Sequence, residues 1–220
     1  MKYKILNLYC CVGGNRFKWD DLVIGTDIEL EVTAVEIDPE LARLYQERFP
    51  NDIVIITDAH QYLLDHYKEF DFIWSSSPCP THSRARFARH STTKVEYPDM
   101  NLYQEIIFLE YYFKGKYCIE NVIPFYTPLI YAKKRGRHLY WTNFNLPSDL
   151  NERDSGIMEG KDEVKRWCCF HEYNFYQYKG TQRIDKVARN LVDYEAGKTI
   201  LAHALNIFQK SESKQTELFN

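Results

Sequence analysis

Short β-rich apolar runs alternate with amphipathic segments over the first two thirds of the chain, and this alternation constrains the fold more than any other feature. We expect strands at residues 5–10, 31–37, 53–56, 70–74 and 117–122. We expect helices between them at residues 39–49, 59–67 and 100–113. Strands that alternate with helices form parallel βαβ units. The sequence therefore predicts an α/β fold with a doubly wound, mostly parallel sheet.

The pattern changes beyond Pro128, where a short β segment at residues 138–142 is followed by a charged and aromatic stretch with little periodicity. A final helix is expected at residues 194–208 because its apolar positions recur at helical spacing. The predicted organisation is a core domain, a small insertion, a segment that returns to the core and a polar tail. These parts comprise residues 1–146, 147–185, 186–209 and 210–220.

Charge and cysteine content exclude several classes of protein. The chain has 28 Lys plus Arg against 31 Asp plus Glu, a net charge of −3, and no run approaches the roughly 18 apolar residues of a membrane span. Six cysteines occur without a C-x-x-C motif, so we expect no zinc site and reduced thiols in the cytoplasm. Asn7 interrupts the apolar start of the chain and no cleavage motif follows it, so we do not expect export.

Three strand ends carry residues suited to binding a ligand, since ligands of doubly wound sheets lie at the carboxyl ends of the strands. Gly13 and Gly14 follow the first strand and would let the backbone approach a ligand closely. Glu36 ends the second strand, where a carboxylate can accept hydrogen bonds from both ribose hydroxyls. Asp58 ends the third. The alternatives are a tight loop for the glycines and a helix cap for Asp58.

Cys79 follows the fourth strand and is the strongest candidate for a catalytic residue. Pro78 and Pro80 flank it and fix its backbone, which presents the thiol at the strand end. Nearby cations lower the pKa of a thiol. Four follow here, namely His82, Arg84, Arg86 and Arg89. The alternative is a small buried apolar side chain.

Glu120 lies in the apolar run of the fifth strand, so its carboxyl must pair, stay protonated or perform chemistry. The strand-end rule places it in the same crevice as Cys79. A satisfied buried glutamate is the alternative. Basic residues also cluster at 133–137, as either a solvated face or a phosphate contact.

In this order, the segments resemble the motifs of the cytosine-C5 DNA methyltransferase family, especially its short phage and prophage members. The resembling segments are NLYCCVGG, VEID, TDA, SPCPTHS, ENV, GRHLYWTNF and RNLVDYEAG. They run from residue 5 to about residue 205 and leave residues 147–185 uncovered. The chain departs from the family at three positions, with Cys11 and Arg189 in place of glycine and Asn7 in place of aspartate.

The resemblance implies a Rossmann-like, class I AdoMet-dependent methyltransferase fold with S-adenosylmethionine as cofactor. It implies that Cys79 attacks C6 of cytosine, that Glu120 hydrogen-bonds N3 and the exocyclic amine, and that Arg137 assists at the base. The implied cofactor-binding residues are Tyr9, Gly13, Gly14, Glu36, Ile37, Asp58, Ala59, Pro78 and Asn190.

Double-stranded DNA is the partner that the resemblance implies, with the target cytosine flipped out of the helix. The expected DNA contacts are Ser83, Arg84, Arg86, Arg89 and Arg135. Residues 147–185 occupy the place of the family's target-recognition region, and their short length implies a short site, loose specificity or a second subunit. Their aromatic side chains favour a small core of their own over DNA contact. Two alternatives stay open, a tRNA methyltransferase and an idle DNA-binding homologue.

Overall fold

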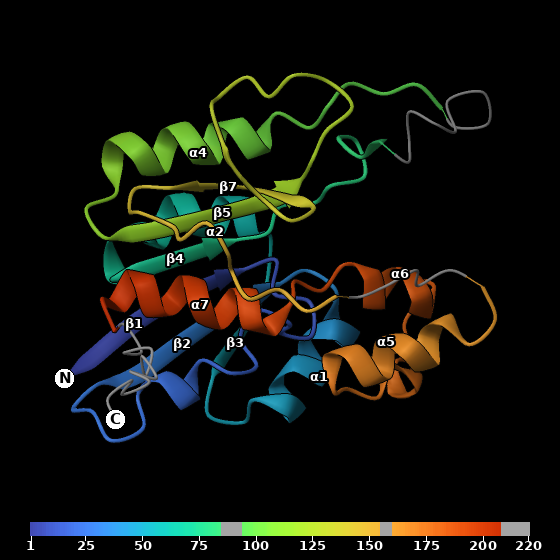
Figure 1. The fold of residues 1–220 in the computed structure, drawn as a ribbon, viewed down its shortest axis with the longest axis horizontal. Coiled ribbons are helices and arrows are strands. Elements are labelled where there is room, and N and C mark those ends of the chain that lie inside the picture. Colours follow the sequence, from blue (N-terminus) through green and yellow to red (C-terminus); the bar gives the residue numbers. More distant parts are fainter. Residues whose placement is uncertain (85–93, 155–159, 208–220) are drawn as a thin grey trace, which may run out of the picture.

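A twisted seven-stranded sheet forms the centre of the computed structural model, which describes residues 1–84, 94–154 and 160–207 (Figure 1). The strand order is β3-β2-β1-β4-β5-β7-β6. The strands span Lys2–Leu8 (β1), Glu29–Glu36 (β2), Ile53–Ile56 (β3), Phe72–Ser75 (β4), Lys116–Val122 (β5), Lys133–Arg135 (β6) and His138–Thr142 (β7). β1 to β5 pair in parallel, and β7 pairs antiparallel with β5 and β6. The predicted doubly wound, mostly parallel sheet is confirmed.

Helices connect the strands and span Pro39–Arg48 (α1), Ala59–His66 (α2), Asn101–Tyr112 (α4), Glu163–His171 (α5), Ile184–Arg189 (α6) and Tyr194–Leu205 (α7). Of these helices, α1, α2 and α7 begin at an aspartate cap. The Asp38 side chain accepts hydrogen bonds from two backbone N–H groups of the first turn of α1, and Asp193 accepts one at α7. Within the described ranges, no helix combines the length and the apolar character that crossing a bilayer requires.

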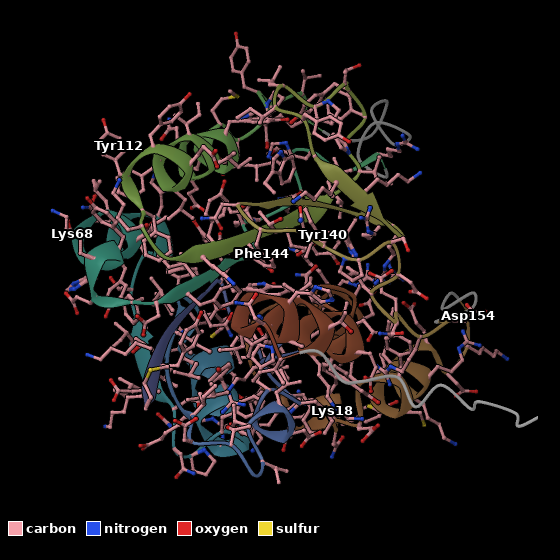
Figure 2. The ribbon with its side chains drawn as sticks, turned by 60° about the vertical axis from the view of Figure 1, so that its left-hand side comes forward. Lys18, Lys68, Tyr112, Tyr140, Phe144 and Asp154 are labelled. Atoms are coloured by element: carbon pink, nitrogen blue, oxygen red, sulfur yellow. The ribbon has the colours of Figure 1, made fainter. Side chains whose placement is uncertain are left out.

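The helices cover both faces of the sheet, which explains why the strands are apolar on both sides. Leu8 and Ile73 pack on one face with α2 and α4, whereas Phe72 and Trp74 pack on the other with α7. Figure 1 shows α4 and α7 on opposite sides of the strands. Figure 2 shows Tyr140 of β7 in the interior of the molecule and Tyr112 at its periphery, in line with exposed fractions of 0% and 62%.

Residues 160–189 form a helical layer on α1 rather than an irregular stretch. Trp167 of α5 and Val187 of α6 pack with Leu41 and Leu44 of α1, and Figure 1 shows α5 and α6 beside that helix. Trp167 and Phe175 are buried, as expected of a small aromatic core, whereas Tyr176 is exposed. We expected little periodicity in this stretch, but Val164, Trp167 and Cys168 of α5 recur at helical spacing and pack in one cluster.

The segment after α6 closes on the turn that follows β1. A Cβ on Gly14 would lie 2.5 Å from the carbonyl oxygen of Val192, so only glycine permits this approach. The indole of Trp19 donates a hydrogen bond of 3.2 Å to the carbonyl oxygen of Gly197 in α7. Residues 190–197 therefore pack directly against the N-terminal turn.

Candidate active site

A cavity of about 270 Å³ lies at the carboxyl ends of the central strands, where doubly wound sheets bind their ligands. The loops after β1, β2, β4 and β5 form one side of it, and residues 182–192 form the other. Its lining includes Tyr9, Cys11, Glu36, Ile37, Leu41, Pro78, Cys79, Glu120, Asn121, His138, Gln182, Lys186, Arg189 and Asn190. The cavity thus brings Cys79 and Glu120 together, two residues that lie on different strand ends.

Cys79 is half-buried at the start of a tight turn, in which its carbonyl oxygen accepts hydrogen bonds of 3.0 Å from the backbone N–H groups of His82 and Ser83. Burial raises the pKa of the Cys79 thiol and the charge of Glu120 raises it further, while Lys186 on α6 opposes the shift. The thiol therefore needs a partner that takes its proton before it can act as a nucleophile.

The expected lowering of the Cys79 pKa by the cations that follow it is wrong for the described residues. His82 is buried, and its Nδ1 hydrogen-bonds the Tyr126 hydroxyl, so the ring stabilises the loop. The Arg84 guanidinium donates to the carbonyl oxygen of Pro124 at 3.2 Å. Arg86 and Arg89 lie outside the described residues.

Asn121 connects the end of β5 to the loop that carries Cys79. Its side-chain amide donates to the carbonyl oxygen and the hydroxyl of Ser77, at 3.0 and 3.2 Å. Asn121 is 2% exposed, and its neighbour Glu120 is 6% exposed. The hydrogen bonds fix the position of Cys79 relative to the carboxyl of Glu120.

His138, at the start of β7, lies beside Glu120 in the place where we expected Arg137. Its Nε2 is 3.6 Å from Oε1 of Glu120, and its Nδ1 is 3.8 Å from Oε1 of Glu152. Arg137 does not line the cavity, since its guanidinium lies over the Trp167 ring at 5.8 Å. Apart from its place in an expected strand next to a basic cluster, nothing in the sequence indicated a role for His138.

Two further predicted DNA contacts, Ser83 and Arg135, differ in their surroundings. Ser83 forms an isolated bridge with Pro124 at the rim of the Cys79 turn. Arg135 donates hydrogen bonds to the carbonyl oxygens of Leu146 and Pro147, which anchor the chain after β7. Arg135 thus has a structural role in addition to the predicted one.

Glu36 organises the wall of the cavity where the cofactor is predicted to bind, and it is 8% exposed. Its carboxylate accepts hydrogen bonds from the backbone N–H groups of Cys11, Ile37 and Asp38, at 2.9, 2.9 and 3.0 Å. Burial raises the pKa of Glu36, and these three donors oppose the shift. A carboxylate offers about four acceptor positions, so one remains for a ligand hydroxyl.

Tyr9, at the end of β1, is held by a buried carboxylate that sequence reasoning missed. Its hydroxyl donates to Glu105 of α4 at 2.6 Å, and Glu105 also accepts from Ser75 at 2.6 Å and faces Nδ1 of His60 at 3.0 Å. Glu105 is 1% exposed. It joins the ends of β1 and β4 to α2 and α4, which makes this wall of the cavity rigid.

Four of the predicted cofactor residues do not line the cavity. Gly13 has a φ of +72°, and a Cβ there would lie 2.3 Å from the Phe49 ring, so it packs against the end of α1. Gly14 packs against the segment after α6. Asp58 caps α2 by accepting from the backbone N–H of Gln61 at 2.9 Å, and Ala59 is buried in the first turn.

Comparison with known proteins identifies a family for the part of the chain that forms the parallel strands. A family model described as C-5 cytosine-specific DNA methylase matches residues 3–123, which include β1 to β5, Cys79 and Glu120. No curated protein matches the chain.

Solved structures of methyltransferases resemble the chain. A mutant of Spodoptera frugiperda DNMT2 is 23% identical with a TM-score of 0.38, and the match covers 55% of this chain and 35% of that one. The Entamoeba histolytica methyltransferase EhMeth is 10% identical with a TM-score of 0.43, over 100% of this chain and 90% of that one. A TehB-like SAM-dependent methyltransferase from Corynebacterium glutamicum is 17% identical with a TM-score of 0.34, over 55% of each chain.

Proposed function

The chain belongs to the C-5 cytosine-specific DNA methylase family, and from this premise we propose that it methylates C5 of a cytosine flipped out of double-stranded DNA. Members of this family take the methyl group from S-adenosylmethionine. The observation that carries the proposal is that Cys79 and Glu120, from two different strand ends, line one cavity together with Glu36.

The lining of the cavity fits S-adenosylmethionine. Glu36 retains one acceptor position for a ribose hydroxyl, and its negative charge attracts a cationic ligand. Ile37 and Leu41 provide an apolar wall for the purine ring, and Tyr9 provides an aromatic one. Pro78 and Asn190 complete the predicted residues on the cavity wall. When bound, the cofactor supplies an electrophilic methyl group on a sulfonium.

Cys79 and Glu120 then have complementary tasks. The Cys79 thiol gives its proton to solvent and its sulfur forms a bond to C6 of the base, while the Glu120 carboxyl gives a proton to N3, so that no negative charge accumulates on the ring. C5 becomes nucleophilic and is the atom that the bound cofactor would methylate. Loss of the C5 proton to solvent and cleavage of the bond between Sγ and C6 release Cys79, and N3 returns its proton to Glu120.

DNA recognition in the proposal involves the rim of the cavity and the layer of α5 and α6. A base stacked in a duplex lies out of reach of a half-buried thiol, so it must be flipped out. Ser83 and Arg84 lie in the turn after Cys79, and Arg137 is exposed beside Trp167. We assign target recognition to residues 147–185, with Arg137 at the boundary between this region and the base.

Replacing the nucleophile tests the proposal. The Cys79→Ser variant is expected to lose methyl transfer to duplex DNA and to lose the covalent complex with 5-fluorocytosine DNA, while S-adenosylmethionine still binds. Cys169→Ser is the matched control, because Cys169 is exposed on α5 and does not line the cavity. Unchanged turnover of Cys79→Ser would refute the assignment. If the protein methylates tRNA and not duplex DNA, the proposed reaction would stand and the proposed substrate would be wrong.

A further inference from the structure

His138 lies between two carboxylates, one inside the cavity and one nearer to solvent. Antiparallel pairing places His138 opposite Val122, so its side chain lies beside the end of β5 that carries Glu120. Nε2 faces Glu120 at 3.6 Å, and Nδ1 faces Glu152 at 3.8 Å. The His138 side chain is 11% exposed, and among the described residues its buried Nδ1 has no hydrogen-bond partner. Both ring nitrogens thus face an acid without being bonded to it.

Glu152 is held in this position by its own contacts. The Tyr140 hydroxyl donates to its Oε1 at 3.3 Å. Its other oxygen packs so closely on Gly136 that a Cβ there would lie 1.9 Å from it. The Glu152 side chain is 22% exposed, compared with 8% for Glu120. The three groups therefore run from the cavity toward solvent.

We propose that His138 is a positioning residue that acts through Glu120, by passing a proton between Glu120 and Glu152. This role rests on the proposed function, in which Glu120 must hold a proton at the moment when Cys79 attacks the base. Glu120 is buried, and water reaches it poorly. A relay through His138 connects it to a carboxyl that solvent reaches.

The proton step is balanced, and it moves the negative charge from Glu120 to Glu152. His138 Nε2 gives its proton to Oε1 of Glu120, which becomes a carboxylic acid. His138 Nδ1 takes a proton from the Glu152 carboxyl, which solvent reprotonates. The imidazole stays neutral and changes tautomer. Both distances exceed a hydrogen bond of about 2.7–3.2 Å, and catalytic hydrogen bonds of this kind shorten when substrate binds.

The groups around His138 act on it with opposite signs. Two carboxyl groups lie beside the ring nitrogens, and two cations of α6 line the same cavity. The groups that face the same space are Glu120 on β5, Glu152 after β7, Tyr140 on β7, Cys79 after β4, and Lys186 and Arg189 on α6.

Single-turnover methyl transfer as a function of pH tests the relay. His138→Gln keeps a polar side chain of similar size and cannot change tautomer, so we expect a rate roughly tenfold to a hundredfold lower, with S-adenosylmethionine affinity unchanged. We expect Glu152→Gln to produce the same altered pH profile. Added imidazole is expected to restore rate to His138→Ala. His66→Gln is the control, since His66 faces Glu69 at 2.8 Å on the surface, away from the cavity.

Two results would overturn the relay. One is a His138→Gln enzyme with the wild-type rate and pH profile. The other is equal loss of rate and cofactor binding at every pH without rescue by imidazole, which indicates a packing role.

Nitrogen NMR of His138 in the free protein separates this proposal from the proposed function. The ratio of its two neutral tautomers is expected to change in Glu120→Gln and in Glu152→Gln, because each change replaces one of the two carboxyl groups that the ring nitrogens face. No change of this ratio in either variant would reject the relay, whether or not the enzyme methylates DNA. A change in both, in a protein that methylates neither DNA nor tRNA, would instead reject the function.

Discussion

Asp52→Asn is expected to weaken the fold far more than Asp20→Asn, although both carboxylates bind the same guanidinium. Arg16 follows the glycine turn and donates two hydrogen bonds of 2.9 Å to Asp52. It donates two more to Asp20, at 2.9 and 3.1 Å. The Arg16 and Asp52 side chains are each 4% exposed, whereas that of Asp20 is 65% exposed. The two pairs thus differ mainly in burial.

The magnitude follows from this difference. Removing one partner of a buried ion pair costs roughly 3–5 kcal/mol, because the other charge stays buried. Asp20 still neutralises part of the Arg16 charge, so we expect about 3 kcal/mol, at the low end of that range. A loss of about 3 kcal/mol is more than a hundredfold in the folding equilibrium. The exposed pair with Asp20 contributes about 0.5 kcal/mol.

Urea unfolding monitored by tryptophan fluorescence measures both variants, since Trp19 is fully buried next to Arg16. The isosteric change preserves shape, so the assay isolates the lost charge and the altered hydrogen bond from the Tyr45 hydroxyl, 2.8 Å from Asp52. Equal losses of unfolding free energy in the two variants would refute the reasoning. That result would mean that water solvates the Asp52 carboxylate, so that this pair behaves like the exposed pair with Asp20.

Two further predictions concern a buried histidine and a glycine. Burial is the main cause that lowers the pKa of His171 to about 3, so below pH 6.5 the unfolded chain binds a proton that the folded protein does not. Between pH 6 and 5 the wild type should lose about 1 kcal/mol more unfolding free energy than His171→Phe, and equal losses in urea titrations would contradict this. Gly14→Ala should weaken S-adenosylmethionine binding at least tenfold, because the new Cβ would displace Val192 and Leu191, which line the cavity. Calorimetry measures the affinity, and an unchanged affinity would show that the turn adapts to the Cβ.

The sheet was predictable because strands that are buried on both faces appear in the sequence as short apolar runs. The expected strands at 53–56 and 138–142 agree with β3 and β7 residue for residue, and the boundaries of the other expected strands differ by at most three residues. The strand-end rule likewise placed Cys79 and Glu120 in one crevice, because parallel strands end at the same edge of the sheet.

The remaining features depend on contacts between distant residues. His138 enters the cavity through the antiparallel register of β7 with β5, and local sequence does not encode that register. Glu105 braces Tyr9 from a helix 96 residues away in the sequence. The pKa of Cys79 was mispredicted because a list of neighbouring cations does not show where they point, and both His82 and Arg84 bind other loop groups.

The closure of residues 190–197 on the turn after β1 has a consequence for the order of assembly during translation. Lys18 pairs with Glu195, 177 residues later, and Trp19 bonds to the backbone of the same helix. A nascent chain still attached to the ribosome can form the parallel strands early, but one wall of the cavity has not yet been synthesised. Closure of the cavity therefore requires the late residues that line it, and a shortened product that keeps Cys79 but lacks them has one wall of the cavity missing.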